Sequence, residues 1–73
     1  MKVTLEFNLP EESSEHRLAI QAPDMHCVLW NFSNKIRAKL KHGQLSDAEE
    51  KVWEEVRGVF WALMEDYNVK FED

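Results

Sequence analysis

The stretch SDAEEKVWEEVRGVFWALMEDY, from Ser46 to Tyr67, carries the most regular pattern in the sequence. Ser46 to Glu49 has the form of a capping box, in which each of the two side chains bonds the other residue's backbone N–H group. The apolar residues of the stretch recur at intervals of three and four, as on one face of an α-helix. They are Ala48, Val52, Trp53, Val56, Val59, Phe60, Leu63 and Tyr67. This pattern predicts a helix over about 46–67, with Asn68 as its stop.

The preceding residues predict a second long helix, over about 24–41. Pro23 and Asp24 favour a helix start there, because aspartate is a good N-cap residue. The apolar residues fall within one arc of this helix, as a face that packs on a core requires. They are Met25, Val28, Leu29, Phe32, Ile36 and Leu40. Gly43 ends the pattern, since glycine is common at a left-handed C-cap. The short connection at 42–45 then favours an antiparallel hairpin of the two helices.

Both ends of the chain alternate in polarity. Residues 2–9 predict a half-buried strand, and residues 69–72 predict a second, shorter strand. After the first strand, Pro10 and the two acids that follow it suit a helix N-terminus, so a short helix is expected over about 10–21. The inner face of this short helix would carry His16, Ala19 and Ile20.

These elements predict the fold class. We expect a single α+β domain over residues 1–73, in the order β-α-α-α-β. The two long helices form the hairpin, and the terminal strands form a two-stranded sheet. Because two strands alone are marginal in water, the sheet would lean on the helices or on a neighbouring chain. The pattern leaves open whether the strands run parallel.

Composition bounds the classes of function. The chain has 73 residues, 44% of them hydrophobic, and a formal net charge of −5. Direct nucleic-acid binding is not expected, because neutralising phosphates requires a basic surface. No apolar run approaches the roughly 20 residues that a membrane span needs. The single cysteine, Cys27, cannot form an internal disulfide, which is consistent with a reducing, cytoplasmic location.

The residue types that carry catalysis or bind metals are not arranged for either role. The spacing of the three histidines and Cys27 brings no pair of ligands toward one ion, as a zinc site would require. Two glycines cannot form a phosphate-binding loop. The carboxylates fall mostly on polar helix faces, where solvent keeps them ordinary. We therefore expect no enzymatic activity, no cofactor and no metal site.

Two tryptophans fall off the apolar stripes of the long helices. At 100° per residue, Trp30 lies about 120° from the centre of its stripe and Trp61 about 140° from the centre of its own. Exposed aromatic side chains beside arginine are typical of binding hot spots. The predicted binding residues are Trp30, Asn34, Arg37, Lys41, Arg57 and Trp61. The alternative is that the short first helix or the sheet covers one of the tryptophans.

Short motifs along nearly the whole chain resemble those of small uncharacterised proteins encoded by bacteriophages and prophages. The motifs are Leu9-Pro10-Glu11-Glu12, Leu29-Trp30, Ile36-Arg37 and Leu40-Lys41, followed by an acidic last helix. The chain departs from their pattern at Ser13-Ser14 and at His16, where charged residues and a large apolar residue are usual. The resemblance implies a context rather than a chemistry, since small phage proteins commonly bind a host protein, a defence complex or a signalling nucleotide.

These observations support three interpretations. The first is a non-enzymatic, phage-encoded interaction protein that binds or inhibits a host or defence factor and self-associates, as a homodimer for example, through its exposed aromatic face. The alternative is a small-ligand binding or sequestering protein, in which Trp30 stacks on a nucleotide base while Arg37 and Lys41 hold its phosphate. The third is mimicry of nucleic acid by the acidic last helix.

Overall fold

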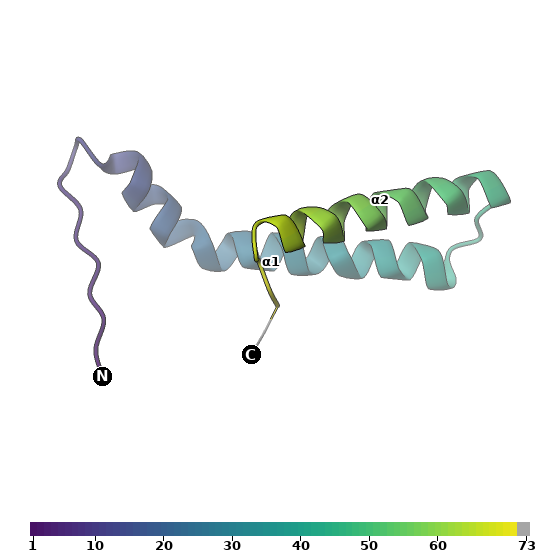
Figure 1. Ribbon diagram of the computed structural model, residues 1–73, viewed down its shortest axis with the longest axis horizontal. Helices are drawn as coiled ribbons and strands as arrows, with labels where there is room; N and C mark the ends of the chain where they lie inside the picture. The colour runs from purple at the N-terminus through teal and green to yellow at the C-terminus, as the bar shows by residue number, and fades with distance from the viewer. Residues whose placement is uncertain (72–73) are drawn as a thin grey trace.

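The computed structural model describes residues 1–71 and shows an antiparallel pair of α-helices (Figure 1). Helix α1 spans Ser13–His42, and helix α2 spans Asp47–Asp66. The predicted helical hairpin is therefore confirmed, and the predicted range of the second helix, 46–67, agrees with α2 to within a residue at each end.

The α+β fold class is wrong, because residues 1–71 contain no strand or sheet. The segment predicted as the first strand runs away from the hairpin without a neighbour to pair with (Figure 1). Residues 69–71 of the second predicted strand do not form a strand either, and Glu72 lies outside the described residues. An alternation of polar and apolar residues also fits an extended segment with one face against a helix. Two short strands, moreover, gain too little free energy from pairing to form a stable sheet alone.

The extended N-terminal segment does lean on α1 near its start. The ring of Phe7 lies 5.4 Å from the ring of His16, measured between centroids. Of the three residues predicted on the inner face, His16 and Ala19 are partly buried there, whereas Ile20 is 63% exposed. These three residues line a shallow hollow with Leu5, Phe7 and Leu9. Phe7 is thus the partly buried residue by which this segment contacts α1, whereas residues 1–6 are exposed.

The short helix predicted at 10–21 and the long helix predicted at 24–41 are one helix. α1 continues through Pro23, although proline supplies no N–H group for a helical hydrogen bond. Figure 1 shows that α1 bends in its N-terminal third, which agrees with proline as the usual cause of helix kinks. The prediction that Pro23 ends a helix was wrong. The residues on both sides of Pro23 tolerate a helix, and the loss of a single hydrogen bond does not end α1.

Both ends of α2 are satisfied by local hydrogen bonds. The predicted capping box is confirmed: the Glu49 N–H donates to Ser46 Oγ at 3.2 Å, and the Ser46 N–H donates to Glu49 Oε1 at 3.3 Å. At the other end Asn68 takes a left-handed conformation, with φ of 55°. The Val69 N–H then donates to the Met64 carbonyl at 2.8 Å, as in a Schellman motif. This turn sends the chain back toward the hairpin.

Gly43 ends α1, but not in the predicted left-handed conformation. Its φ and ψ are −72° and 145°, which any residue can adopt. Its N–H donates to the Lys39 carbonyl at 3.0 Å. A Cβ atom on Gly43 would lie 2.5 Å from that same carbonyl oxygen. Glycine is therefore required here because the backbone of Lys39, in the preceding turn, lies so close, and not because of its φ angle.

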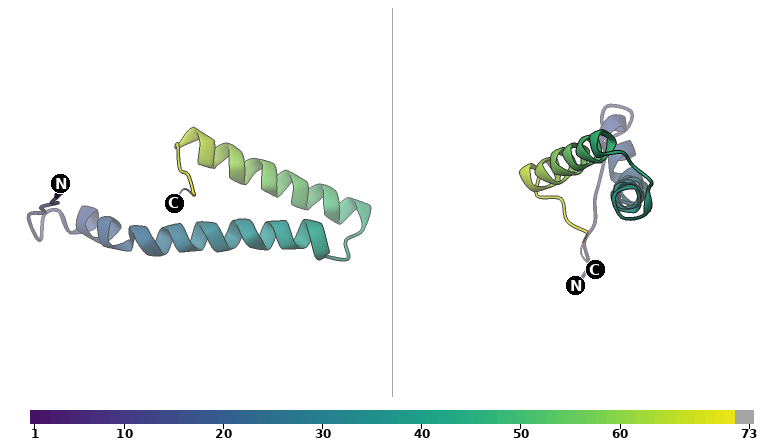
Figure 2. Two further views of the ribbon diagram at one scale, coloured as in Figure 1. Left: turned by 90° about the horizontal axis from the view of Figure 1, so that it is seen from below. Right: turned by 90° about the vertical axis from the view of Figure 1, so that its right-hand side faces the viewer.

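The core between the two helices is small. Only Ile36, Phe60 and Met64 are buried among the described residues. Five partly buried side chains surround them: Leu29, Leu40, Trp53, Val56 and Phe71. The chain measures 52 × 29 × 20 Å, with a radius of gyration of 17.2 Å against about 11 Å for a compact domain of this length. Because α1 is longer than α2, its N-terminal part extends beyond the hairpin (Figure 2).

Candidate functional site

The six binding residues predicted from the sequence all line one groove along the hairpin. They are Trp30, Asn34, Arg37, Lys41, Arg57 and Trp61. Ser33 and Leu40 complete the lining, and the volume of the groove is about 610 Å³. We refer to these eight residues as the basic groove. Both α1 and α2 contribute to the basic groove. On each helix the lining residues share one face, because side chains three or four positions apart point in similar directions.

The two tryptophans form walls of the basic groove. Trp30, on α1, is 47% exposed, and Trp61, on α2, is 46% exposed. The ring of Phe71 meets both indoles nearly at right angles, with centroid distances of 5.2 Å to Trp30 and 5.8 Å to Trp61. The partial cover of both tryptophans therefore comes from the C-terminal segment. The alternative that the first helix or a sheet covers one of them is not what the structure shows.

Phe71 is the structural residue of this site that the sequence patterns missed. Beyond the two tryptophans, its ring lies 5.5 Å from the ring of His26 and 6.4 Å from that of Phe60. It therefore links the walls of the basic groove to the buried core. The Schellman turn at Asn68 predicts an apolar contact only for the next residue, Val69, so it gives no signal for Phe71.

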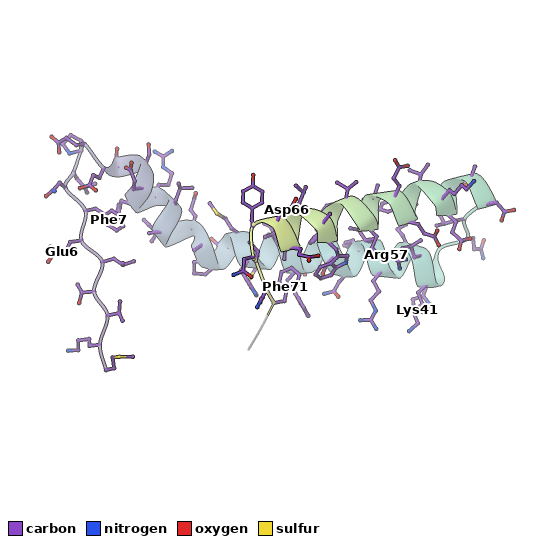
Figure 3. The ribbon with its side chains drawn as sticks, in the orientation of Figure 1. Glu6, Phe7, Lys41, Arg57, Asp66 and Phe71 are labelled. Atoms are coloured by element: carbon purple, nitrogen blue, oxygen red, sulfur yellow. The ribbon has the colours of Figure 1, made fainter. Side chains whose placement is uncertain are left out.

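The charges that line the basic groove are all positive. They come from Arg37, Lys41 and Arg57, and no carboxylate is among the lining residues within 1–71. Figure 3 shows Lys41 near the loop end of α1 and Arg57 on the facing helix. The formal net charge of the whole chain is −5, so this groove is a local reversal of sign. Such a surface attracts anionic groups over a distance of about one Debye length, roughly 8 Å at physiological salt.

A second, apolar groove also runs along the helix pair, and it shares no lining residue with the basic groove. Its volume is about 600 Å³. Its lining is apolar or aromatic apart from Glu55: Leu29, Phe32, Val52, Val56, Val59, Phe60, Leu63, Met64, Tyr67 and Val69. Most of these residues belong to the apolar stripes that were predicted to face the core. Several are instead exposed, because a two-helix fold covers only part of such a wide stripe.

Other kinds of site have less support in the geometry. Among residues 1–71, no three histidine, cysteine, aspartate or glutamate side chains converge as metal ligands would. Cys27 is exposed and carries a free thiol. Within the same part of the chain, neither helix combines the length and the apolar character needed to cross a bilayer.

No family model matches the chain, and comparisons with curated proteins and with solved structures give no match either. Function is therefore inferred from the residues of the two grooves.

Proposed function

We propose that this protein is a non-enzymatic interaction protein that binds an acidic segment of a partner protein in the basic groove. The observation that carries this proposal is the joint lining of one groove by two half-exposed tryptophans and three cations, with no carboxylate among its described lining residues. Tryptophan and arginine are among the residues most enriched at the energetic centres of protein interfaces. A cationic surround adds attraction for carboxylates and speeds association.

The length of the groove favours a peptide segment over a point contact. Trp30 and Lys41 lie on the same helix, roughly 16 Å apart at 1.5 Å per residue. An extended peptide spans this distance with about five residues at 3.3 Å each. The indoles lie toward one end of the groove and Lys41 toward the other. A matching segment therefore has an apolar residue at one end and acidic residues at the other.

The class of partner follows from the resemblance to small phage-encoded proteins. We propose a host or defence factor as the partner, with inhibition as the consequence of binding. When this protein binds an acidic segment of such a factor, that segment could no longer contact the basic surface that it normally binds.

A second candidate function uses the same groove for a nucleotide. Trp30, Arg37 and Lys41 all line it, and Trp30 is about half exposed. An indole can stack on a base, while a guanidinium and an ammonium bind phosphate oxygens through charge-assisted hydrogen bonds. This arrangement would suit a protein that sequesters nucleotides.

Tryptophan fluorescence can separate the two candidates. The probes are a synthetic peptide of leucine followed by glutamates, and a panel of linear and cyclic nucleotides. The peptide should change the emission of the wild-type chain saturably, with an affinity that falls as salt is added. Saturable quenching by a nucleotide, without a response to the peptide, would replace the first candidate with the second. No response to either probe would reject both.

Charge reversal localises the binding. Arg37→Glu should weaken peptide binding at least about tenfold, which corresponds to about 1.4 kcal/mol. Arg17→Glu is the matched control, because Arg17 is exposed on α1 and does not line the basic groove. It changes the net charge equally and should leave the affinity nearly unchanged. Equal losses in both variants would mean that the peptide responds only to overall charge.

A further inference from the structure

The apolar groove has the properties of an interface with another helix pair. We propose that it binds the same groove of a second copy of this chain, so that two hairpins form a two-fold symmetric four-helix bundle. The proposal is independent of the function of the basic groove, because the two grooves share no lining residue.

Helix α2 carries more apolar surface than α1 can cover. One seam of α2, made by Trp53, Phe60 and Met64, packs toward α1 and is buried or partly buried. A second seam runs beside it through Val52, Val59 and Leu63, and each of these side chains is more than half exposed. An apolar stripe of this width on a helix predicts neighbours on two sides.

The spacing of the second seam is that of a helix–helix interface. With Val56 included, the residues of this seam are separated by four, three and four positions. This is the heptad spacing by which helices pack knobs into holes in coiled coils and four-helix bundles. The apolar groove beside the seam also has a wall from α1, formed by Leu29 and Phe32. Ridge and groove are therefore present on the same face.

A ridge next to a groove is self-complementary under a two-fold axis. When the α2 seam of one copy enters the groove of the other, the reverse contact forms at the same time. One symmetric contact thus covers both apolar faces, whereas a single helix from another protein would leave the outer seam partly open. Glu55 is the only charged residue among the described lining residues.

The surface area supports the same assembly. The accessible surface of the chain is 6761 Å², whereas a compact monomer of 8.7 kDa exposes about 4,700 Å². The excess of about 2,000 Å² belongs to the whole elongated chain, the exposed N-terminal segment included, and it is larger than the roughly 800 Å² that each partner buries in a standard interface. The apolar stripe of α1 also continues beyond the end of α2, through the exposed side chains of Leu18 and Met25. A second hairpin lying antiparallel to the first can cover this stripe.

Sedimentation equilibrium of the full chain tests the proposal directly. The wild type should sediment at twice its chain mass of 8.7 kDa through the micromolar range. Val59→Glu places a charge in the centre of the groove and should weaken the dimer at least about a hundredfold, a change of about 2.7 kcal/mol. Val3→Glu is the matched control, because Val3 is exposed on the N-terminal segment and lines neither groove. It should remain dimeric.

A second measurement keeps the proposal testable if Val59→Glu fails to fold. The Tm of the wild type should rise with protein concentration, since dimerisation stabilises only the folded chain. A wild type that is monomeric with a Tm independent of concentration overturns the proposal. So does a dimer that survives Val59→Glu with native helicity, or an oligomer larger than two chains.

Discussion

The ring of Phe71 meets the indole of Trp30 edge to face, with ring centroids 5.2 Å apart and an interplanar angle of 81°. The same ring meets Trp61 at 5.8 Å and 80°. One side chain from the C-terminal segment therefore contacts both aromatic walls of the basic groove, which come from different helices. It links the stability of the helix pair to the shape of the candidate site.

Replacing Phe71 should loosen the basic groove and destabilise the hairpin. Phe71→Ala removes ring contacts to both tryptophans, each worth about 0.5–1.5 kcal/mol beyond burial. Truncation of a fully buried phenylalanine to alanine lowers protein stability by about 3–5 kcal/mol. Because Phe71 is only partly buried, a loss of about 1–3 kcal/mol is expected. Tryptophan emission should shift to longer wavelength as water reaches the indoles.

Phe7→Ala is the control for this variant. Phe7 also makes a ring contact, with His16 at 5.4 Å, but no tryptophan is part of that contact. Its removal should leave the emission wavelength unchanged. An unshifted emission in Phe71→Ala would contradict the cover that Phe71 gives to the indoles.

The parts of the fold that the sequence predicted depend on nearby residues. The capping box at Ser46 and Glu49 and the stop at Asn68 are local hydrogen-bonding patterns, so they could be read directly. The prediction of two terminal strands was wrong because the same alternation of polarity also fits an extended segment outside a sheet. Whether such a segment joins a sheet depends on a second strand beside it, which the alternation does not reveal. Pro23 failed as a boundary because the helix tolerates it.

The candidate site could be predicted for a related reason. The 3.6-residue period of each helix placed the two tryptophans and their cationic neighbours on the same side, and the short loop then brought the two helices together. Phe71 was missed because its position depends on the turn after Asn68 and on the space between two helices. The exposed valines of the apolar groove were assigned to the core because a stripe indicates a buried face without saying which neighbour buries it.

The capping box predicts a specific dependence of stability on pH. Hydrogen bonds from the side chain and then the backbone of Ser46, helped by the charge of Lys39, lower the pKa of the Glu49 carboxyl. A lowered pKa in the folded state stabilises the fold above the ordinary pKa that Glu49 has in the unfolded chain, and this contribution is lost as pH falls through the folded value.

Ser46→Ala should remove that dependence together with the cap. The expected loss at neutral pH is about 1 kcal/mol, as for other N-cap serines, and the pKa of Glu49 should rise toward its usual value. Urea unfolding at neutral and acidic pH and an NMR titration of Glu49 measure the two effects. Ser33→Ala, a serine-to-alanine change inside α1, should leave the pKa of Glu49 unchanged. An unchanged pKa in Ser46→Ala would contradict the capping box.

The two glycines should respond to alanine with opposite signs. Gly43→Ala places a Cβ atom 2.5 Å from the Lys39 carbonyl oxygen, so the backbone must shift, at an expected loss of about 1–3 kcal/mol. Gly58 lies inside α2 with open space around the same position, and alanine there should stabilise the helix by about 0.5–1 kcal/mol. Thermal unfolding should show Gly58→Ala melting roughly 2–8 °C higher than the wild type. Equal effects in the two variants would contradict the close approach at Gly43.

The proline inside α1 should limit the helicity and stability of the chain. Pro23→Ala restores an N–H group that can donate to the carbonyl four residues earlier, at Ala19. Because proline is about 3 kcal/mol less favourable than alanine inside a helix, a gain of about 1–3 kcal/mol is expected, with a stronger circular dichroism signal at about 222 nm. Gln21→Ala, an exposed change in the same turn, alters no backbone donor and should change little. If Pro23→Ala leaves both helicity and urea midpoint unchanged at the same protein concentration, then α1 is not continuous through residue 23.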